Sequence, residues 1–569
     1  MKVLTTAHAE LITQAIAQAQ AAGDLPAFEI PEVRVQAPNN PELADYASPV
    51  AMQLARLARM APLKIAEAIV KHLPSAEFVG HVEVAAPGFI NFRLDEDWLK
   101  QQVEAIISEG EDWGQLHLMA GKRAQVEFVS ANPTGPLHVG RTRGAVLGDS
   151  VARLLEAVGY DVEREYYFNN AGRQMEMLGR TLRARYLQAL GQDEPLPEEG
   201  YAGEYLKEIA ADLVQEVGDA WADRDWPDFK ERAEAVIFGW IRNSLLRLGV
   251  KHDVFFNENS LYESGAIWET LEALRKGGYI YESPVWEGAD EAEREAALAQ
   301  NAANATWFRS TQFGDEKDRV LVKASGDPTY TLPDIAYHVN KLERGFDFLV
   351  NILGADHGTQ YKVVQYGLQA LGYDVSKLHV TIHQMVSIYK GGELIKGSTR
   401  AGDIIPIDEV IDEVGPDSVR YFLLARSPNS DVEFDLDLAV AQNNENPVYY
   451  IQNAHVRCAG IFRMAAQQEF SDEGADLSLL GEPETAFLRQ ALRLGETLVY
   501  ALEEMAPHQL AFFALETARL FHPMYDNVRV FHSEVPEDVA RARLRFYRAA
   551  KIVFQRLLTM MGMSAPEVM

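Results

Sequence analysis

The segment most suggestive of chemistry is 130–149, which reads SANPTGPLHVGRTRGAVLGD. It lies between an expected strand over 123–130 and an expected helix, at the carboxyl end of the strand, where open parallel sheets bind ligands. Pro136 shapes the turn, Gly140 lets a phosphate approach the backbone amides that begin the helix, and His138 can donate to a phosphoryl oxygen. These features predict a phosphate site. A plain strand–helix turn with a surface histidine is the alternative.

A second candidate for phosphate binding is the glycine-rich segment 390–403, KGGELIKGSTRAGD. It follows an expected strand and carries Lys396, Ser398, Thr399 and Arg400. Such a cationic loop can close over a polyphosphate, because ammonium and guanidinium groups donate strong hydrogen bonds to phosphate oxygens. The alternative is a solvated hairpin.

Carboxylates also stand near the ends of expected strands. The segment 326–338 places Tyr330 and Asp334 four residues apart, and GADHGTQ at 354–360 adds Asp356. Carboxylates in these positions can hold a cationic group of a substrate. Helix capping by the two aspartates is the alternative.

The elements that position these residues predict a parallel α/β sheet. The strand at 123–130, a helix with apolar residues at spacings of three and four, and a strand at 161–168 form a βαβ unit. Residues at about 180–300 are mostly helical and polar, which indicates an insertion between two halves of the sheet. The strand pattern resumes at 319–323, 348–354 and 379–389.

The flanking segments have other patterns. Residues 1–115 begin with helical patterning and end in two short β runs at 81–94, which indicates a small α+β domain. Residues 446–569 have long 3.6-residue periods and predict an all-α helix bundle. The parallel-sheet domain then covers 116–405, and 406–445 is a connecting segment.

Composition excludes several classes of protein. The chain has 569 residues, with 53 basic and 84 acidic side chains and a net charge of −31, so it is not expected to coat nucleic acid. Cys458 is the single cysteine, which excludes a disulfide framework and a cysteine-rich zinc site and suits the cytoplasm. No run of about 18 apolar residues predicts a membrane span, and the N-terminus does not resemble a signal peptide.

One segment of this acidic chain is strongly basic. Residues 541–556, RARLRFYRAAKIVFQR, hold six basic and no acidic side chains. On a helix, Arg541, Arg545, Arg548 and Arg556 fall within an arc of about 80°, and the apolar side chains lie away from it. Such a stripe of arginines can meet RNA phosphates. A solvated helix face is the alternative.

Segments 130–149 and 390–403 together resemble the two nucleotide-binding motifs of class I aminoacyl-tRNA synthetases. Longer blocks resemble arginyl-tRNA synthetase, from about residue 40 to the last residue: EFVSANPTGPLHVG, YYFNNAGRQM, NENSLYESG, TWFRSTQFGDEKDRVLVKASGDPTYTLPDIAYH, IDEVGPDSVRYFLL, NNENPVYYIQNAH and GMSAPEVM. The resemblance implies a Rossmann-like catalytic domain, an N-terminal domain that contacts the tRNA corner, and a helical anticodon-binding domain.

The resemblance also implies roles for individual residues. Those implied for catalysis are His138, Gly140, Arg141, Lys396, Ser398 and Arg400. Those implied for ATP are Pro136, His138, Gly140, Gly354, His357, Met385, Val386, Lys396 and Ser398. Those implied for arginine are Glu127, Asn132, His138, Tyr330, Asp334 and Gln360. Those implied for tRNA are Phe89, Asn91, Tyr525 and Met569, and the basic stripe adds Arg541, Arg545 and Arg548 as expected tRNA contacts. A guanidinium presents five planar donors, which paired carboxylates can accept.

Three positions depart from the family's motifs. Arg141 stands where the first motif usually has a second histidine. The second motif lacks its methionine, and Thr399 stands in place of its last lysine. Arg141 and Arg400 place positive charge beside the altered positions, so we expect the charge to be relocated rather than lost.

The implied reaction is ATP-dependent ligation of L-arginine to its tRNA through arginyl-adenylate, with release of AMP and pyrophosphate. The expected partners are the tRNA for arginine, L-arginine, and ATP with Mg²⁺, without zinc, DNA or a membrane. The protein is expected to be a cytoplasmic monomer, and arginine activation is expected to need tRNA. The alternatives are a tRNA-binding paralogue with lost or weak arginine activation and a class I enzyme for another amino acid.

Overall fold

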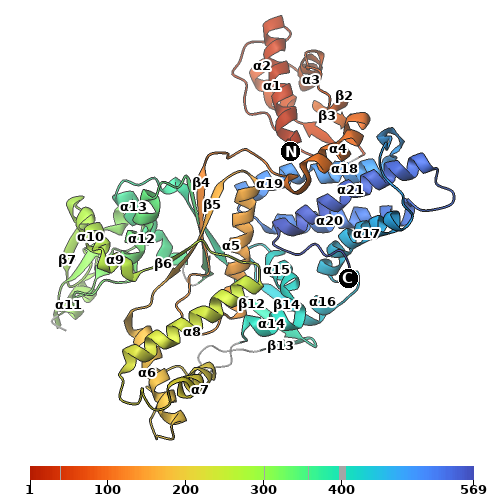
Figure 1. Cartoon of the computed structure of the whole chain (residues 1–569). Coiled ribbons are helices and arrows are strands. Elements are labelled where there is room, and N and C mark those ends of the chain that lie inside the picture. The colour runs from red at the N-terminus through yellow and green to blue at the C-terminus, as the bar shows by residue number, and fades with distance from the viewer. Residues whose placement is uncertain (39, 41, 300–301, 356–357, 396–404) are drawn as a thin grey trace. The chain divides into compact units, whose positions relative to one another are not determined.

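The computed structural model describes residues 1–38, 40, 42–299, 302–355, 358–395 and 405–569 (Figure 1). The chain divides into two compact units. The terminal unit combines 1–118 with 442–569, and the central unit is 119–441.

A parallel sheet of five strands organises the central unit. Its strand order is β11-β10-β4-β5-β6, and every neighbouring pair is parallel. The strands are β4 (Arg123–Glu127), β5 (Asp161–Phe168), β6 (Val254–Asn257), β10 (Phe348–Gly354) and β11 (Leu378–His383). The chain starts in the middle, at β4, proceeds to β5 and β6, and then returns to β10 on the other side. The order therefore reverses between β4 and β10, and a reversal of this kind opens a ligand crevice at the carboxyl ends of the strands.

Helices connect consecutive parallel strands on both faces of the sheet. Helix α5 (Val139–Ala157) joins β4 to β5, and α13 (Gly358–Ala370) joins β10 to β11, which is added on the opposite side. Right-handed crossovers in opposite directions place the two helices on opposite faces, as Figure 1 shows. Helix α12 (Thr331–Glu343) packs beside α13. The predicted parallel α/β fold is confirmed.

Helix α5 lies unusually close to the strands because glycines recur on one face. A Cβ added at Gly148 would lie 2.1 Å from the Phe128 side chain, and one at Gly144 would lie 3.0 Å from His383. No side chain fits at either position without displacing its neighbour. The close approach brings the start of α5 to the carboxyl ends of the strands.

Two excursions leave the sheet between β5 and β10. The first contains α6 (Gly172–Ala189), α7 (Tyr205–Val217) and α8 (Trp226–Arg247), and the second contains α9 (Asn259–Glu263), α10 (Ala266–Lys276) and α11 (Glu291–Ala299). The second also forms an antiparallel sheet, in the order β7-β8-β9, from β7 (Ile280–Ser283), β8 (Ala305–Phe308) and β9 (Arg319–Val322).

Two strands differ from the sequence expectation. Strand β6 is an edge of the main sheet although it lies inside the segment expected to be inserted, because four residues are too short to show a period. Strand β9, expected in the main sheet, pairs with β8 instead. An apolar run predicts a strand but does not identify its partner.

A third small sheet completes the central unit. It contains β12 (Val386–Lys390), β13 (Glu393–Ile395) and β14 (Val432–Asp435), and β12 pairs antiparallel with β13 and parallel with β14. The nearby helices are α14 (Ile407–Val414), α15 (Pro416–Leu424) and α16 (Leu436–Val440). The strand expected over 379–389 is thus two strands, β11 and β12, in different sheets.

The terminal unit contains the expected N-terminal α+β domain and C-terminal helix bundle. Its N-terminal elements are α1 (Leu4–Ala22), β1 (Tyr46–Ser48), α2 (Val50–Ala58), α3 (Pro62–Lys71), β2 (Val79–Ala85), β3 (Phe89–Leu94) and α4 (Glu96–Glu109). The three strands form an antiparallel sheet in the order β1-β3-β2. Pro62 begins α3, where its missing N–H leaves no helical bond unmade.

The bundle consists of α17 (Pro447–Gln467), α18 (Glu482–Leu492), α19 (Leu494–Glu503), α20 (His508–Asn527) and α21 (Glu537–Met560). Its core includes an aromatic cluster of Phe487, Phe521, Phe546 and Phe554. As predicted, α21 buries Leu544, Phe546, Val553, Phe554, Leu557 and Leu558. None of the helices in the described ranges is both long enough and apolar enough to cross a membrane.

Candidate active site

The first motif forms the turn between β4 and the start of α5. Val129 and Ser130 have positive φ angles of 70° and 41°, so the chain turns sharply just after β4. His138 caps α5, and a Cβ added at Gly140 would lie 3.2 Å from the His138 ring. Glycine at position 140 therefore leaves room for the imidazole against the first helical turn.

His138 is a neutral imidazole at physiological pH. Burial, with a smaller contribution from the positive charge of Arg141, lowers the pKa of His138 to about 4. A neutral ring has one N–H donor and one acceptor nitrogen. Arg141 is exposed in the first turn of α5, next to this donor. A hydrogen-bond donor and a positive charge therefore occur together at the positive end of the helix dipole.

Arg143, which the sequence did not single out, ties the motif to the neighbouring backbone. Its side chain is buried, and it donates to the carbonyl oxygens of Gln384 at 2.8 Å, Ser430 at 2.7 Å and Ser427 at 2.9 Å. Burial lowers the pKa of Arg143 to about 10, so the guanidinium stays charged at pH 7. It therefore holds the start of α5 against the backbone beside β12 and β14.

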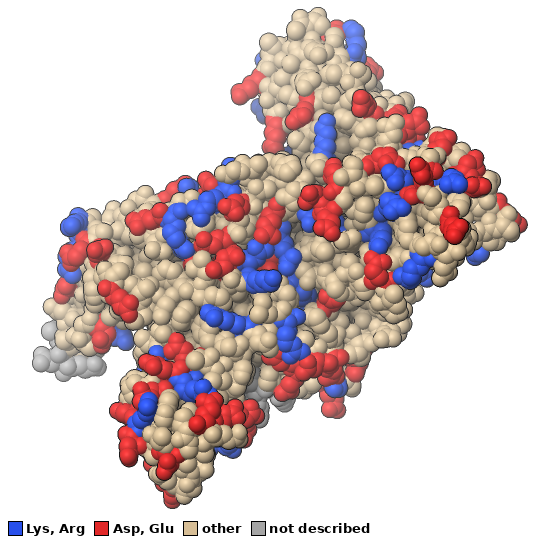
Figure 2. All heavy atoms as spheres, in the orientation of Figure 1, with Lys and Arg blue, Asp and Glu red and all other residues tan. Residues whose placement is uncertain are grey.

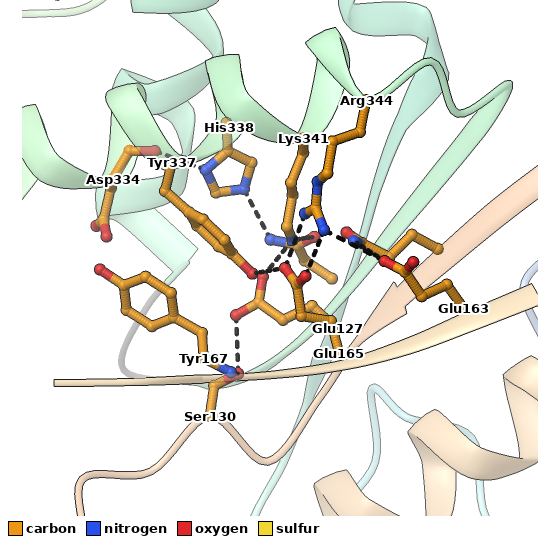
Figure 3. A network of polar contacts seen from close by, with 12 residues as sticks. Glu127, Ser130, Glu163, Glu165, Tyr167, Asp334, Tyr337, His338, Lys341 and Arg344 are labelled. Atoms are coloured by element: carbon orange, nitrogen blue, oxygen red, sulfur yellow. Dashed lines mark hydrogen bonds and ion pairs between the residues drawn. The ribbon is translucent and has the colours of Figure 1, made fainter. Parts of the chain in front are cut away.

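Glu127, at the end of β4, belongs to a buried polar network (Figure 3). Its Oε1 accepts a hydrogen bond from Ser130 Oγ at 2.8 Å, and its Oε2 lies 2.5 Å from Lys341 Nζ. Lys341 also donates to Asn351 Oδ1 at 3.0 Å. The side chains of Lys341 and Glu127 are 0% and 6% exposed, so the ion pair is shielded from water.

The network continues through His338 to the start of α12. Asn351 Nδ2 lies 2.8 Å from His338 Nε2, and His338 Nδ1 lies 2.7 Å from the carbonyl oxygen of Asp334. These partners require Nδ1 to carry the proton and Nε2 to accept. Burial and the charge of Lys341 lower the pKa of His338 to about 3, which keeps the ring neutral.

A second group of contacts fixes α12 to β5. Tyr337 donates to Glu165 Oε1 at 2.5 Å, and Arg344 donates to both Glu165 oxygens at 2.6 and 3.0 Å and to Glu163 at 3.2 Å. Sequence analysis did not single out Glu165, Lys341 or Arg344. The signal for Lys341 and Arg344 is the spacing of three and four residues that they share with His338, and Figure 3 shows these side chains facing the strands.

The residues expected to bind arginine are partly brought together. Tyr330 comes just before α12 and is 79% exposed. Asp334 lies in the first turn of α12. Burial and the charges of Asp334 and Glu258 raise the pKa of Tyr167, whose hydroxyl donates to Glu258 at 2.5 Å. In Figure 3 the Tyr167 hydroxyl points toward Asp334, whereas the Glu127 carboxylate is turned toward the polar network. Carboxylates therefore lie at the end of β4, just after β6 and in the first turn of α12, and we call Glu127, Glu258 and Asp334 the carboxylate region.

Asn132 also lies at the ends of β4 and β5. Its Oδ1 accepts from the backbone N–H of Asn169 at 3.0 Å, and its Nδ2 donates to Gln174 Oε1 at 3.0 Å. Asn169 in turn donates to Glu258 Oε1 at 2.8 Å. This chain of bonds orients Asn132 beside the carboxylate region.

The residues expected to bind ATP follow the neighbouring strands. Gly354 ends β10 and pairs with His383, and Met385 and Val386 come just after β11. Met385 is 70% exposed. The expected residues Pro136, His138 and Gly140 begin α5, which follows β4, so the set lies at the carboxyl ends of adjacent strands. The rest of the expected site lies outside what the structure describes: His357, Lys396, Ser398, Arg400 and the side chain of Gln360.

The expected tRNA contacts in the terminal unit are accessible to different degrees. Along β3, Phe89 and Asn91 lie on a half-exposed face, whereas Ile90 and Phe92 are buried. Phe89 is therefore not a core residue. In the bundle, Tyr525 is half-buried beneath the Arg457 guanidinium, 4.8 Å from its ring, and Met569 is 53% exposed.

Three of the four arginines in the basic stripe of α21 are already paired with carboxylates. Arg545 donates to Glu104 at 2.6 and 2.8 Å, Arg548 donates to Asp472 at 2.8 Å through two nitrogens, and Arg541 donates to Glu537 at 2.6 Å. Figure 2 likewise shows Lys and Arg interspersed with Asp and Glu over the face it draws. RNA phosphates would have to compete with these carboxylates.

Three protein-family models match consecutive parts of the chain. They describe the arginyl tRNA synthetase N-terminal domain over residues 7–94, the class I (R) tRNA synthetase catalytic domain over 102–423 and the DALR anticodon binding domain over 451–569.

Relatives match over the full length. The arginine–tRNA ligase of Moorella thermoacetica is 43% identical over 572 residues, covering 99% of this chain and 98% of the relative. That of Bacillus licheniformis is 43% identical over 548 residues, covering 95% of each. The solved structure of Thermus thermophilus arginyl-tRNA synthetase shares the fold with a TM-score of 0.72 at 22% identity and covers both chains completely. The family resemblance seen in the motifs is confirmed, and the chain belongs to the arginyl-tRNA synthetase family.

Proposed function

We infer that the protein ligates L-arginine to its tRNA with ATP, by way of arginyl-adenylate. The observation that carries this inference is the 43% identity to arginine–tRNA ligases over almost the whole of both chains. The carboxylates at the end of β4, just after β6 and at the start of α12 support a cationic amino acid as substrate.

The first step needs no general base. The carboxylate of arginine, already ionised, attacks the α-phosphate of ATP, its oxygen–phosphorus bond forms, and the bond to the leaving pyrophosphate breaks. Catalysis then consists of positioning and charge stabilisation. The neutral His138 donates a hydrogen bond to a phosphate oxygen, while Arg141 and the first amides of α5 supply positive potential. In the second step a terminal ribose hydroxyl of the tRNA attacks the carbonyl carbon, and AMP leaves.

Arginine binds with its guanidinium toward the carboxylate region. Asp334 and Glu127 supply negative charge, while Asn132, Tyr330 and Gln360 complete the pocket. Glu127 reaches the substrate in a fixed orientation, because Ser130 and Lys341 already hold its two oxygens.

ATP binds along the carboxyl ends of β4, β10 and β11. Its contacts include Pro136, Gly140, Gly354, Met385 and Val386, and the segment with His357, Lys396, Ser398 and Arg400 completes the site. Mg²⁺ enters with ATP as part of the substrate complex, where it offsets negative charge on the phosphates.

The tRNA contacts the terminal unit. Residues 1–115, with Phe89 and Asn91, meet the tRNA corner, and the bundle over 446–569, with Tyr525, Met569 and the arginines of α21, meets the anticodon. The half-exposed face of β3 supports the first contact. We propose that the protein acts as a monomer in the cytoplasm.

The test is aminoacylation of bulk tRNA with each of the twenty amino acids separately. Charging with arginine alone is the expected result. Charging with a different amino acid would contradict the assigned specificity, and the absence of charging with any of them would indicate a tRNA-binding paralogue.

A further inference from the structure

Tyr361, on α13, has a buried hydroxyl that the described structure leaves without a hydrogen bond. The side chain is 7% exposed, and no partner for its oxygen occurs among the described residues. Burying a hydroxyl without a partner costs free energy, so natural proteins rarely leave one unmatched unless it serves a function.

The surroundings of this hydroxyl are those of the arginine pocket. The Tyr361 ring packs edge-on against His338, with 5.5 Å between ring centroids. His338 lies one turn after Asp334 on α12 and connects, through Asn351 and Lys341, to Glu127. Burial and the negative charges of Glu127 and Asp334 raise the pKa of Tyr361 well above its usual range. The phenol is therefore protonated, and it interacts electrostatically with both carboxylates.

We propose that Tyr361 is a further arginine-binding residue, whose hydroxyl oxygen accepts a hydrogen bond from the guanidinium of the substrate. The proposal rests on the proposed function and adds a group to its substrate site. A guanidinium carries five N–H donors and no acceptor. When water is excluded from the pocket, each of these donors needs an oxygen of the protein as its hydrogen-bond acceptor. Both oxygens of Glu127 already accept from Ser130 and Lys341, which makes a neutral acceptor close by valuable.

The proposal is tested with Tyr361→Phe, which removes only the oxygen. A hydrogen bond to a charged group typically changes affinity about 10- to 100-fold. We therefore expect the KM for arginine in tRNA charging to rise by about that factor, while the KM for ATP is unchanged. The matched control is Tyr366→Phe on the same helix, which should alter neither constant.

Thermal unfolding separates binding from a structural role. Because the hydroxyl has no partner among the described residues, Tyr361→Phe should not lower the melting temperature without arginine, but it should reduce the increase that added L-arginine produces. An unchanged KM for arginine would overturn the proposal, and so would a lowered melting temperature with equal changes in both KM values. Failure of the parent chain to charge arginine would instead refute the proposed function.

Discussion

The ammonium group of Lys341 lies 2.5 Å from Glu127 Oε2, with both side chains almost completely buried. A buried ion pair is costly to break, because removing one partner leaves a charge without compensation in a medium of low polarity. The pair therefore connects the stability of the central unit to the orientation of a proposed substrate ligand.

Lys341→Met should lower the free energy of unfolding by about 3–5 kcal/mol, measured by urea unfolding, because it isolates the Glu127 carboxylate. Adding Glu127→Gln should recover part of the loss, since the unpaired charge is then removed. Lys362→Met, at an exposed lysine on α13, is the control and should have little effect. A double variant less stable than the sum of the single variants predicts would contradict this account.

Asp334→Asn should keep the fold but weaken arginine recognition. Removing a carboxylate that faces a desolvated guanidinium costs on the order of 2–5 kcal/mol, which should appear as a raised KM for arginine in steady-state charging. Glu343→Gln, at the other end of α12, is the control. An unchanged KM for arginine in Asp334→Asn would remove this residue from the proposed pocket.

Arginine activation should depend on tRNA. The physical basis is that tRNA binds the competent arrangement of the active site more tightly than other arrangements and so shifts the population toward it. ATP–pyrophosphate exchange with arginine should be near background without tRNA and strong when tRNA is added. Strong exchange by the enzyme alone would show that no such coupling exists.

Arg141→Ala and Arg400→Ala should lower kcat more than they raise the KM for ATP, since these cations are proposed to stabilise the leaving pyrophosphate in the transition state. Thr399→Lys should change the rate little, because positive charge is already present. Single-turnover kinetics would measure these effects. A large gain from Thr399→Lys, with no loss from Arg400→Ala, would mean that the charge is not relocated.

Stability should fall on acidification below about pH 6.5, partly through His338. Folding lowers the pKa of His338 from 6.5 to about 3. Between these two values the unfolded chain binds this proton and the folded protein does not, so the free energy of unfolding increases with pH from about 3 to 6.5. One such group contributes at most about 1.4 kcal/mol per pH unit. Urea unfolding at pH 7 and pH 5 should show a smaller difference for His338→Gln than for the parent, whereas His81→Gln, at an exposed histidine, should match the parent.

Local patterns are sufficient to predict where the proposed phosphate-binding residues lie in the fold. The β4–α5–β5 unit follows from an apolar strand, a turn with proline and glycine, and helical spacing, which all act over short distances in the chain. His138 and Gly140 accordingly lie where they were expected, at the start of α5.

The contacts that hold the proposed arginine pocket in place could not be predicted in this way. Lys341 reads as an ordinary solvated lysine near the end of a helix, and only its contact with Glu127, 214 residues away, identifies it as buried. The same holds for Arg143, whose partners are carbonyl oxygens more than 240 residues later. A carbonyl acceptor has no sequence signature, because every residue supplies one.

The choice of partners by Arg143 has a consequence for how this enzyme can vary. Among the described residues, the guanidinium bonds main-chain oxygens of Gln384, Ser427 and Ser430, so the identities of those three residues matter less than the path of their backbone. Substitutions at these three positions can leave the hydrogen bonds intact. Substitution of Arg143 by lysine cannot, because an ammonium group does not present the planar set of donors that reaches three carbonyl oxygens. Sequence constraint on this contact therefore falls entirely on one side.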